Sequence, residues 1–204
     1  MEQFASPEQL SEKDRFLHVF GKALAAWAEV EHQLSLWFGE VVGISADLAQ
    51  DLFFTNKGFN ARIELLKAAL ERRPPPEWNY FLDEAVRRSV AYSAARNRLA
   101  HGTMHPNALN ELGHPVDWRL KEPAEWQQRV GLSFGAVDLI ATNFKSLAAI
   151  IREGYVRHAL EERSLDCHRR LLHLPGVADS TEPNQKQTER LNRLVSLRTS
   201  PLEK

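Results

Sequence analysis

The chain has 204 residues, of which 43% are hydrophobic, enough for one domain with a sizeable core. Its 26 basic and 27 acidic side chains give a formal net charge of -1, so no global positive charge attracts nucleic acid. A single cysteine, Cys167, excludes an internal disulfide framework and suits a reducing compartment. We find no secretory signal and no apolar run near the roughly 20 residues that span a bilayer. We therefore expect a cytoplasmic protein with no membrane partner.

Apolar residues recur at spacings of three and four in five segments, a pattern typical of amphipathic helices. The predicted helices are 6–43, 45–53, 59–70, 76–100 and 133–172. Ser6, Ser45 and Ser133 are placed to cap helix N-termini, and Gly43 and Gly102 are placed to end helices. The third helix ends at three consecutive prolines, which cannot continue a helix interior.

Residues 103–132 lose the helical period and contain three prolines and two tryptophans. We predict a loop-rich insert with a short β-hairpin between 116–120 and 128–132. The polar segment 175–204 is predicted to be a flexible tail with one weak helix near 186–197. The fold class is therefore all-α, a four- to five-helix up-down bundle in which residues 1–174 form one domain.

The segment Gly131–Gly135 reads G-x-S-x-G, the pattern of the nucleophile elbow in serine hydrolases. That fold needs a large sheet, and this sequence has no series of predicted strands. A helix cap at Ser133 explains the serine more simply.

Three histidines, His101, His105 and His114, fall close together and raise the question of a metal site. Gly102 and Pro106 prevent a helical i, i+4 pair between the first two. No cysteine or acidic side chain stands at a ligand spacing from them. We predict no metal site and no cofactor.

The run Arg96–Gly102, RNRLAHG, places dense polar chemistry at the end of the fourth predicted helix. A plain helix C-terminus is the simplest explanation, because arginine and histidine are favoured there. Asn97, however, is a poor helix former that shares a face with His101. In the first helix, Glu31 interrupts the apolar stripe, and a buried carboxylate needs a cation. We predict that Arg96 or His101 supplies that cation and that Glu31 orients the cluster.

This run resembles the signature of HEPN domains, in which an arginine and a histidine are separated by four to six residues. A preceding long helix with Trp27 and Glu31 agrees with the resemblance, which extends from residue 10 to about 160. It implies a metal-independent endoribonuclease that forms homodimers, of the kind found in toxin–antitoxin, phage-defence and RNA-processing systems. It also implies RNA and an antitoxin protein as partners. Some toxin members carry a tyrosine two residues after the histidine; here Thr103 occupies that position, so we do not expect its nucleotidylation.

Carried over residue by residue, Arg96 and His101 match the catalytic pair of the family, and Asn97 matches its variable polar position. An unperturbed histidine has a pKa of about 6.5 and can serve as base or acid near neutral pH. Arginine offers a permanently charged fork of donors to phosphate oxygens. The expected products are a 2′,3′-cyclic phosphate and a 5′-hydroxyl.

Other arginines could bind the RNA backbone, which needs local positive charge. We predict RNA contacts from Arg98, Arg88 and Arg62, although for Arg62, Arg87 and Arg88 a solvated helix face is the simpler explanation. Two other interpretations of the whole chain stay open. One is a catalytically inactive HEPN-like module that binds RNA, nucleotide or a protein partner, and the other is a plain structural bundle.

The spacing of the pair also predicts a site built from two chains. Five residues turn an ideal helix by about 500°, so Arg96 and His101 point roughly 140° apart. Either the last turn unwinds before Gly102, or a second copy supplies the missing group. A symmetric dimer would lay one helical line of the fourth helix against itself. That line contains Leu82, Val86, Val90, Ser93, Asn97 and His101.

Overall fold

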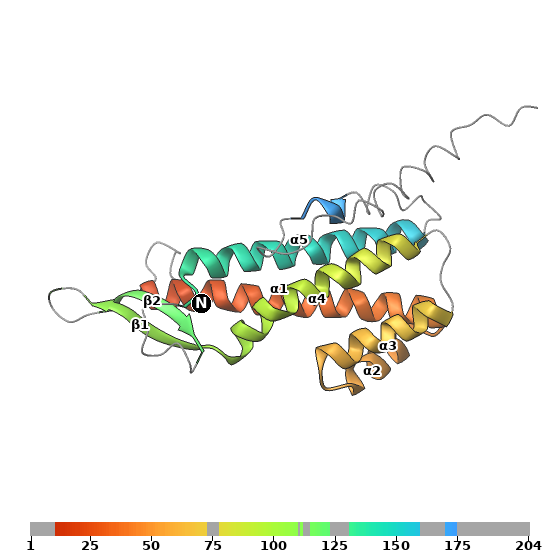
Figure 1. Cartoon of the computed structure of the whole chain (residues 1–204), viewed down its shortest axis with the longest axis horizontal. Helices are drawn as coiled ribbons and strands as arrows, with labels where there is room; N and C mark the ends of the chain where they lie inside the picture. Colours follow the sequence, from red (N-terminus) through yellow and green to blue (C-terminus); the bar gives the residue numbers. More distant parts are fainter. Residues whose placement is uncertain are drawn as a thin grey trace, which may run out of the picture.

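The structure, a computed structural model, describes residues 11–72, 78–109, 111, 115–122, 131–159 and 170–174. This part of the chain contains five helices of at least ten residues and one two-stranded antiparallel sheet. The elements are α1 (Glu12–Val42), α2 (Ala46–Thr55), α3 (Phe59–Arg72), α4 (Asn79–His101), β1 (Thr103–Leu109), β2 (Pro115–Lys121) and α5 (Phe134–Ala159). Figure 1 shows a helical bundle with a small hairpin insert, which confirms the predicted fold class. The predicted tail lies outside the described residues.

Three of the five predicted caps form as predicted. Ser45 and Ser133 each accept a hydrogen bond from a backbone N–H three residues on, at 3.4 and 3.3 Å. Gly43 ends α1 in the left-handed conformation, with φ 78°. At the other end of α1, Ser11 is the N-cap, so the helix begins later than the prediction at Ser6, a residue outside the described part.

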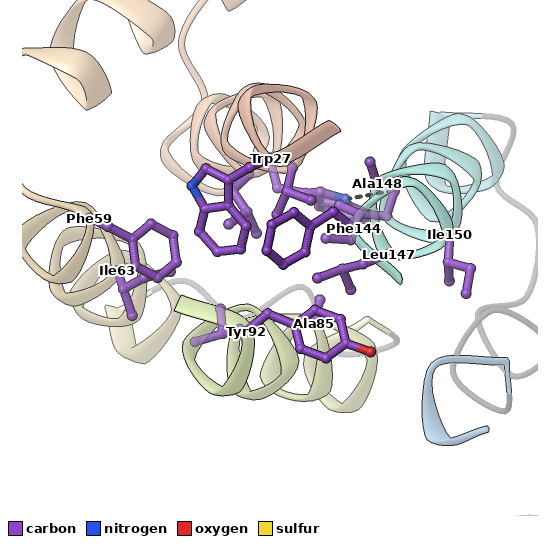
Figure 2. Packing of buried hydrophobic residues seen from close by; sticks show 14 of the residues in the cluster. Trp27, Phe59, Ile63, Ala85, Tyr92, Phe144, Leu147, Ala148 and Ile150 are labelled. Atoms are coloured by element: carbon purple, nitrogen blue, oxygen red, sulfur yellow. Dashed lines mark hydrogen bonds between the residues drawn. The ribbon is translucent and has the colours of Figure 1, made fainter. Parts of the chain in front are cut away.

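Aromatic rings join four helices in the core (Figure 2). The ring of Trp27 on α1 lies 4.9 Å from Phe59 of α3 and 4.9 Å from Phe144 of α5, measured between ring centroids. Tyr92 of α4 reaches the same cluster, with its ring 5.8 Å from Phe144. Because Tyr92 lies one helical turn before Arg96, this packing fixes the position of the last turns of α4.

Helix α5 is long and apolar enough to cross a membrane when judged by length and composition alone. The sequence contains no long uninterrupted apolar run, so we did not expect a helix with this property. A core helix passes the same test, and α5 buries Val137, Phe144, Leu147 and Ile151 against the rest of the bundle. The finding is weak evidence in either direction, so the absence of a membrane partner stays a prediction.

The insert contains a hairpin, and one of its two strands was predicted. Strand β2 covers the predicted segment 116–120 and pairs with β1, which was not predicted. Of the other predicted segment, 128–132, only residues 131 and 132 are described, and Leu132 forms a single bridge with Leu120. β1 escaped prediction because Pro106 lies within it and the register shifts on both sides of Ala108, which hides the alternation typical of a strand.

Gly102 joins α4 directly to the hairpin. Its φ of -74° and ψ of 147° are extended, so it is not the left-handed cap that was predicted. Glycine is needed for a different reason, since a Cβ at this position would lie 2.6 Å from Cγ of Leu120 and 2.7 Å from the carbonyl oxygen of Arg98. The end of α4 therefore presses on β2, and the hairpin extends outward from this end of the bundle (Figure 1).

Candidate functional site

The Arg96–Gly102 sequence forms the end of α4 and stays helical up to His101. The N–H of Gly102 donates to the carbonyl oxygen of Arg98 at 2.9 Å, as in a regular α-helix. The last turn is not unwound, which excludes one of the two explanations for the 140° divergence. The backbone of this single helix therefore directs Arg96 and His101 toward different sides.

A hydrogen bond partly offsets that divergence. Nη1 of Arg96 donates to Oδ1 of Asn97 at 3.1 Å. Asn97 and His101 are both exposed and lie one turn apart on the same face, so the bond turns the guanidinium toward the face of His101. Among the described residues, no carboxylate pairs with Arg96 or His101 and no hydrogen bond joins the two. The end of α4 therefore presents a cation, an amide and an imidazole to solvent.

Glu31 is buried, as its place in the apolar stripe predicts, but its cation is Arg62 rather than Arg96 or His101. Nη1 of Arg62 lies 2.9 Å from Oε1 of Glu31, and the side chains are 12% and 10% exposed. The N–H groups do not point at Oε1, so the contact is an ion pair without an aligned hydrogen bond.

Two further contacts hold Arg62 within the fold. Its Nε donates to the carbonyl oxygen of Asn56 at 2.8 Å, and its guanidinium lies 4.8 Å from the ring centroid of Phe54. Arg62 and Glu31 thus join α3 to α1. Arg62 takes the place of the partners predicted for Glu31, and the RNA contact predicted for Arg62 stays a prediction.

Arg88 is also used within the fold. The buried carboxylate of Glu84 accepts hydrogen bonds from Nε of Arg88 at 2.9 Å and from Nε and Nη2 of Arg87 at 2.7 and 2.5 Å. The two terminal nitrogens of Arg88 donate to the carbonyl oxygens of Leu172 and Leu174, both at 2.9 Å. Arg88 therefore joins α4 to residues 170–174, and its predicted RNA contact stays a prediction.

The charge of Glu84 is stabilised by the same two arginines. Burial alone would raise the pKa of this carboxyl group, but the hydrogen bonds and charges of Arg87 and Arg88 outweigh burial and lower the pKa. Glu84 is consequently an ionised, fully engaged group of the interior.

The remaining predicted residues lie near the motif. Arg98 is partly buried in the last turn of α4, and its contact with RNA stays a prediction. His105 lies opposite Arg119 in the hairpin, and His114 falls outside the described residues. Within the described segments, no three His, Cys, Asp or Glu side chains gather as metal ligands would.

The predicted two-fold contact line is exposed only in its second half. Leu82 and Val86 are 0% and 4% exposed and belong to the core of their own chain. Val90, in contrast, is 42% exposed. The face of α4 that is open to solvent follows a neighbouring line through Asp83, Arg87, Val90, Ala94, Asn97 and His101.

The first half of this open face forms one wall of a groove between α3 and α4. The groove encloses about 630 Å³ and has an apolar floor of Leu70, Val86 and Val90, with Lys67 and Arg87 among its charged residues. The sequence did not predict this groove, because the helical period of each segment does not reveal which helices become neighbours.

Comparison of the chain with models of known protein families, with curated proteins and with solved structures found no match in any of the three.

Proposed function

We propose that this protein is a metal-independent endoribonuclease of the HEPN type, with Arg96, Asn97 and His101 as its catalytic residues. The observation that carries the proposal is the solvent-facing cluster at the end of α4. There, Arg96 bonds Asn97 at 3.1 Å, and no carboxylate of the described residues neutralises Arg96 or pairs with His101. The arginines that serve the fold, Arg62 and Arg88, are in contrast paired with buried carboxylates.

The residue types fit cleavage of RNA by its own 2′-hydroxyl. The reaction needs a base for the 2′-hydroxyl proton, an acid for the leaving 5′-oxygen and positive charge beside the phosphorane. The imidazole of His101 would transfer protons, and the guanidinium of Arg96 would bind the phosphate oxygens through paired donors. Asn97 would keep the guanidinium directed toward the face of His101. The products would be a 2′,3′-cyclic phosphate and a 5′-hydroxyl.

We further propose that the active species is a homodimer with a composite site. The intact last turn of α4 directs Arg96 and His101 apart, and one histidine cannot act as base and acid at the same moment. A two-fold axis near residues 96–101 would bring the second histidine and the second arginine to the same phosphate. The resemblance adds a cytoplasmic toxin–antitoxin or phage-defence setting, in which an antitoxin protein would be the partner.

A second candidate function is a catalytically inactive module of the same fold that binds RNA, nucleotide or a protein partner. The observation that favours it is that two of the three arginines predicted to bind the RNA backbone serve the fold. Arg62 and Arg88 are held in ion pairs with Glu31 and Glu84.

Cleavage of structured and single-stranded RNA in the presence of EDTA tests the proposal. We expect cleavage products with 2′,3′-cyclic phosphate ends, and a loss of at least about 10²–10⁴-fold in rate for His101→Ala, the range typical of a general acid–base residue. His18→Ala removes an exposed histidine of α1 and should change nothing. Cleavage that persists in His101→Ala, or that requires a divalent metal, would contradict the mechanism. Binding of RNA without cleavage by the wild type would support the second candidate.

A further inference from the structure

We propose that the groove between α3 and α4 binds a cationic amphipathic helix of a partner protein. The groove is separate from the residues proposed for RNA cleavage, so this binding does not depend on that activity. The apolar floor of the groove, its unpaired charges and its position on α4 all fit such a partner.

The groove has the form and the floor that a docked helix needs. It lies between two consecutive helices that run in opposite directions (Figure 1), and it encloses about 630 Å³. Leu70 of α3 and Val86 and Val90 of α4 form its apolar floor. Val90 is 42% exposed, whereas the other two side chains are buried. An amphipathic helix binds such a groove by laying apolar side chains, one turn apart, against the floor.

Four charged side chains line the groove, and they differ in whether they have a partner. Lys67 and Arg87 each pair with a carboxylate that lies outside the groove. Glu71 and Asp83, in contrast, form no ion pair with any described residue. The groove therefore presents two uncompensated negative charges beside an apolar floor, and complementary charge favours a cationic partner.

The neighbouring carboxyl groups of Asp83 and Glu84 show what a cation contributes here. Arg87 and Arg88 lower the pKa of Glu84 despite its burial, whereas burial raises the pKa of Asp83. A partly desolvated carboxylate is stabilised when a positive charge comes within a few ångströms of it. A lysine or arginine of the partner would give Asp83 the compensation that the two arginines give Glu84.

The two acids lie at one end of the groove, so the cations of the bound helix have a defined place. Glu71 is in the last turn of α3, and Asp83 is in the second turn of α4. Val90 lies about 10 Å further along α4, toward Asn97 and His101. We expect the cations of the partner at the end remote from the motif, and its apolar side chains between that end and Val90.

A second groove, on the other side of α3, shows that the apolar floor alone does not define the partner. It lies between α1 and α3, encloses about 300 Å³ and is lined mainly by apolar side chains. The charged residue among its described lining residues is Arg72, which would repel a cation. Charge therefore distinguishes the two grooves and assigns the cationic helix to the one between α3 and α4.

Binding of two labelled synthetic peptides tests the charge preference. Both peptides carry leucines at positions i, i+3, i+4 and i+7, and they differ only in having lysines or glutamates at the polar positions. Fluorescence anisotropy with the whole chain should show at least about tenfold tighter binding of the lysine peptide. Equal affinities, or dissociation constants above about 1 mM for both peptides, would overturn the proposal.

Charge variants of the protein locate the binding. The double variant Glu71→Gln, Asp83→Asn should weaken binding of the lysine peptide by at least about tenfold. Both substitutions keep the fold, because Glu71 is exposed and protonation of Asp83 favours the folded state. The control Asp51→Asn, Asp138→Asn removes two exposed acids elsewhere and should keep the affinity within about twofold. Wild-type affinity in the first variant, or an equal loss in the control, would overturn the assignment of this groove.

Two further measurements test other occupants of the groove. Deletion of residues 176–204 should leave the affinity for the lysine peptide within about twofold, whereas a rise of about tenfold would show that this segment of the chain fills the groove. Sedimentation of the variant Glu71→Gln, Asp83→Asn should match that of the wild type, whereas loss of self-association would assign the groove to a second copy. Either of these alternative outcomes would overturn the assignment to a partner protein. No RNA is used, so the results are independent of the proposed ribonuclease.

Discussion

The two halves of α4 use arginine in different ways. In the first half, Arg87 and Arg88 surround the carboxylate of Glu84, and Arg88 also binds two backbone carbonyl groups of residues 170–174. In the second half, Arg96 bonds only the neighbouring amide of Asn97 among the described residues. The comparison shows that an arginine beside a buried carboxylate belongs to the fold, whereas an arginine beside an exposed amide remains available to a ligand.

The largest effect is expected where the core and the open face of α4 meet. Val86→Glu would place a charge at a position that is 4% exposed and should reduce the free energy of unfolding by more than about 3 kcal/mol. Val90→Glu, at a position that is 42% exposed, should leave stability within about 0.5 kcal/mol and weaken the proposed dimer. Urea unfolding and sedimentation measure the two effects separately. Equal destabilisation by both variants would contradict the placement of this boundary.

Removal of Arg88 should give the second-largest loss of stability. Arg88→Ala leaves the carboxylate of Glu84 buried and two carbonyl groups without their donor, so we expect a loss of about 3 kcal/mol. Arg87→Ala is the matched control, because that side chain is 44% exposed and its removal should cost about 1 kcal/mol or less. The measurement is chemical denaturation at neutral pH. An Arg87→Ala variant less stable than Arg88→Ala would reverse the assignment.

Lowering the pH should remove the stability that Glu84 contributes in the first half of α4. Its pKa is lowered in the folded chain, so its contribution to stability is complete above the ordinary value of 4.5 and is lost as the pH falls through the lowered value. The contribution of Asp83 to the pH dependence of stability has the opposite sign. Burial raises the pKa of its carboxyl group, so protonation favours the folded state. Unfolding free energies measured from pH 7 to pH 3 should therefore fall less steeply in Glu84→Gln and more steeply in Asp83→Asn. Parallel curves for all three proteins would show that neither group is perturbed.

The smallest effect is expected from the C-terminal tail. Deletion of residues 176–204 should change the melting temperature by no more than a few degrees, because this segment offers little apolar side-chain area to bury. Deletion from residue 170 is the matched comparison. It also removes the buried Leu171 and Leu174 and the acceptors of Arg88, and should lower the melting temperature much further. Equal effects of the two deletions would show that residues 176–204 contribute to the fold.

Much of the bundle could be predicted from the sequence, because its signals are local. The apolar period locates the helices, and Ser45, Gly43 and Ser133 mark ends that the structure reproduces. The hairpin was only half predicted, since strand β1 contains Pro106 and an irregular register that hide the alternation of a strand.

The partners of buried charges could not be predicted in the same way. The position of Glu31 in an apolar stripe correctly indicates that it is buried and needs a cation, but the cation comes from α3 because the beginning of α3 packs beside α1. That choice depends on which helices become neighbours, and a single sequence does not contain this information. The groove between α3 and α4 was missed for the same reason.

The difference between the two halves of α4 is tested most directly by measuring stability and RNA cleavage together in Arg88→Ala and Arg96→Ala. Arg96→Ala should keep its free energy of unfolding within about 0.5 kcal/mol of the wild type and lose cleavage by about 10³-fold or more. Arg88→Ala should lose about 3 kcal/mol of stability. Its cleavage rate per folded chain should stay within about twofold of the wild type, because a fold residue remote from the reacting atoms leaves transition-state stabilisation unchanged. An Arg96→Ala variant that cleaves RNA at the wild-type rate, or a stable Arg88→Ala variant that does not cleave it, would contradict the account.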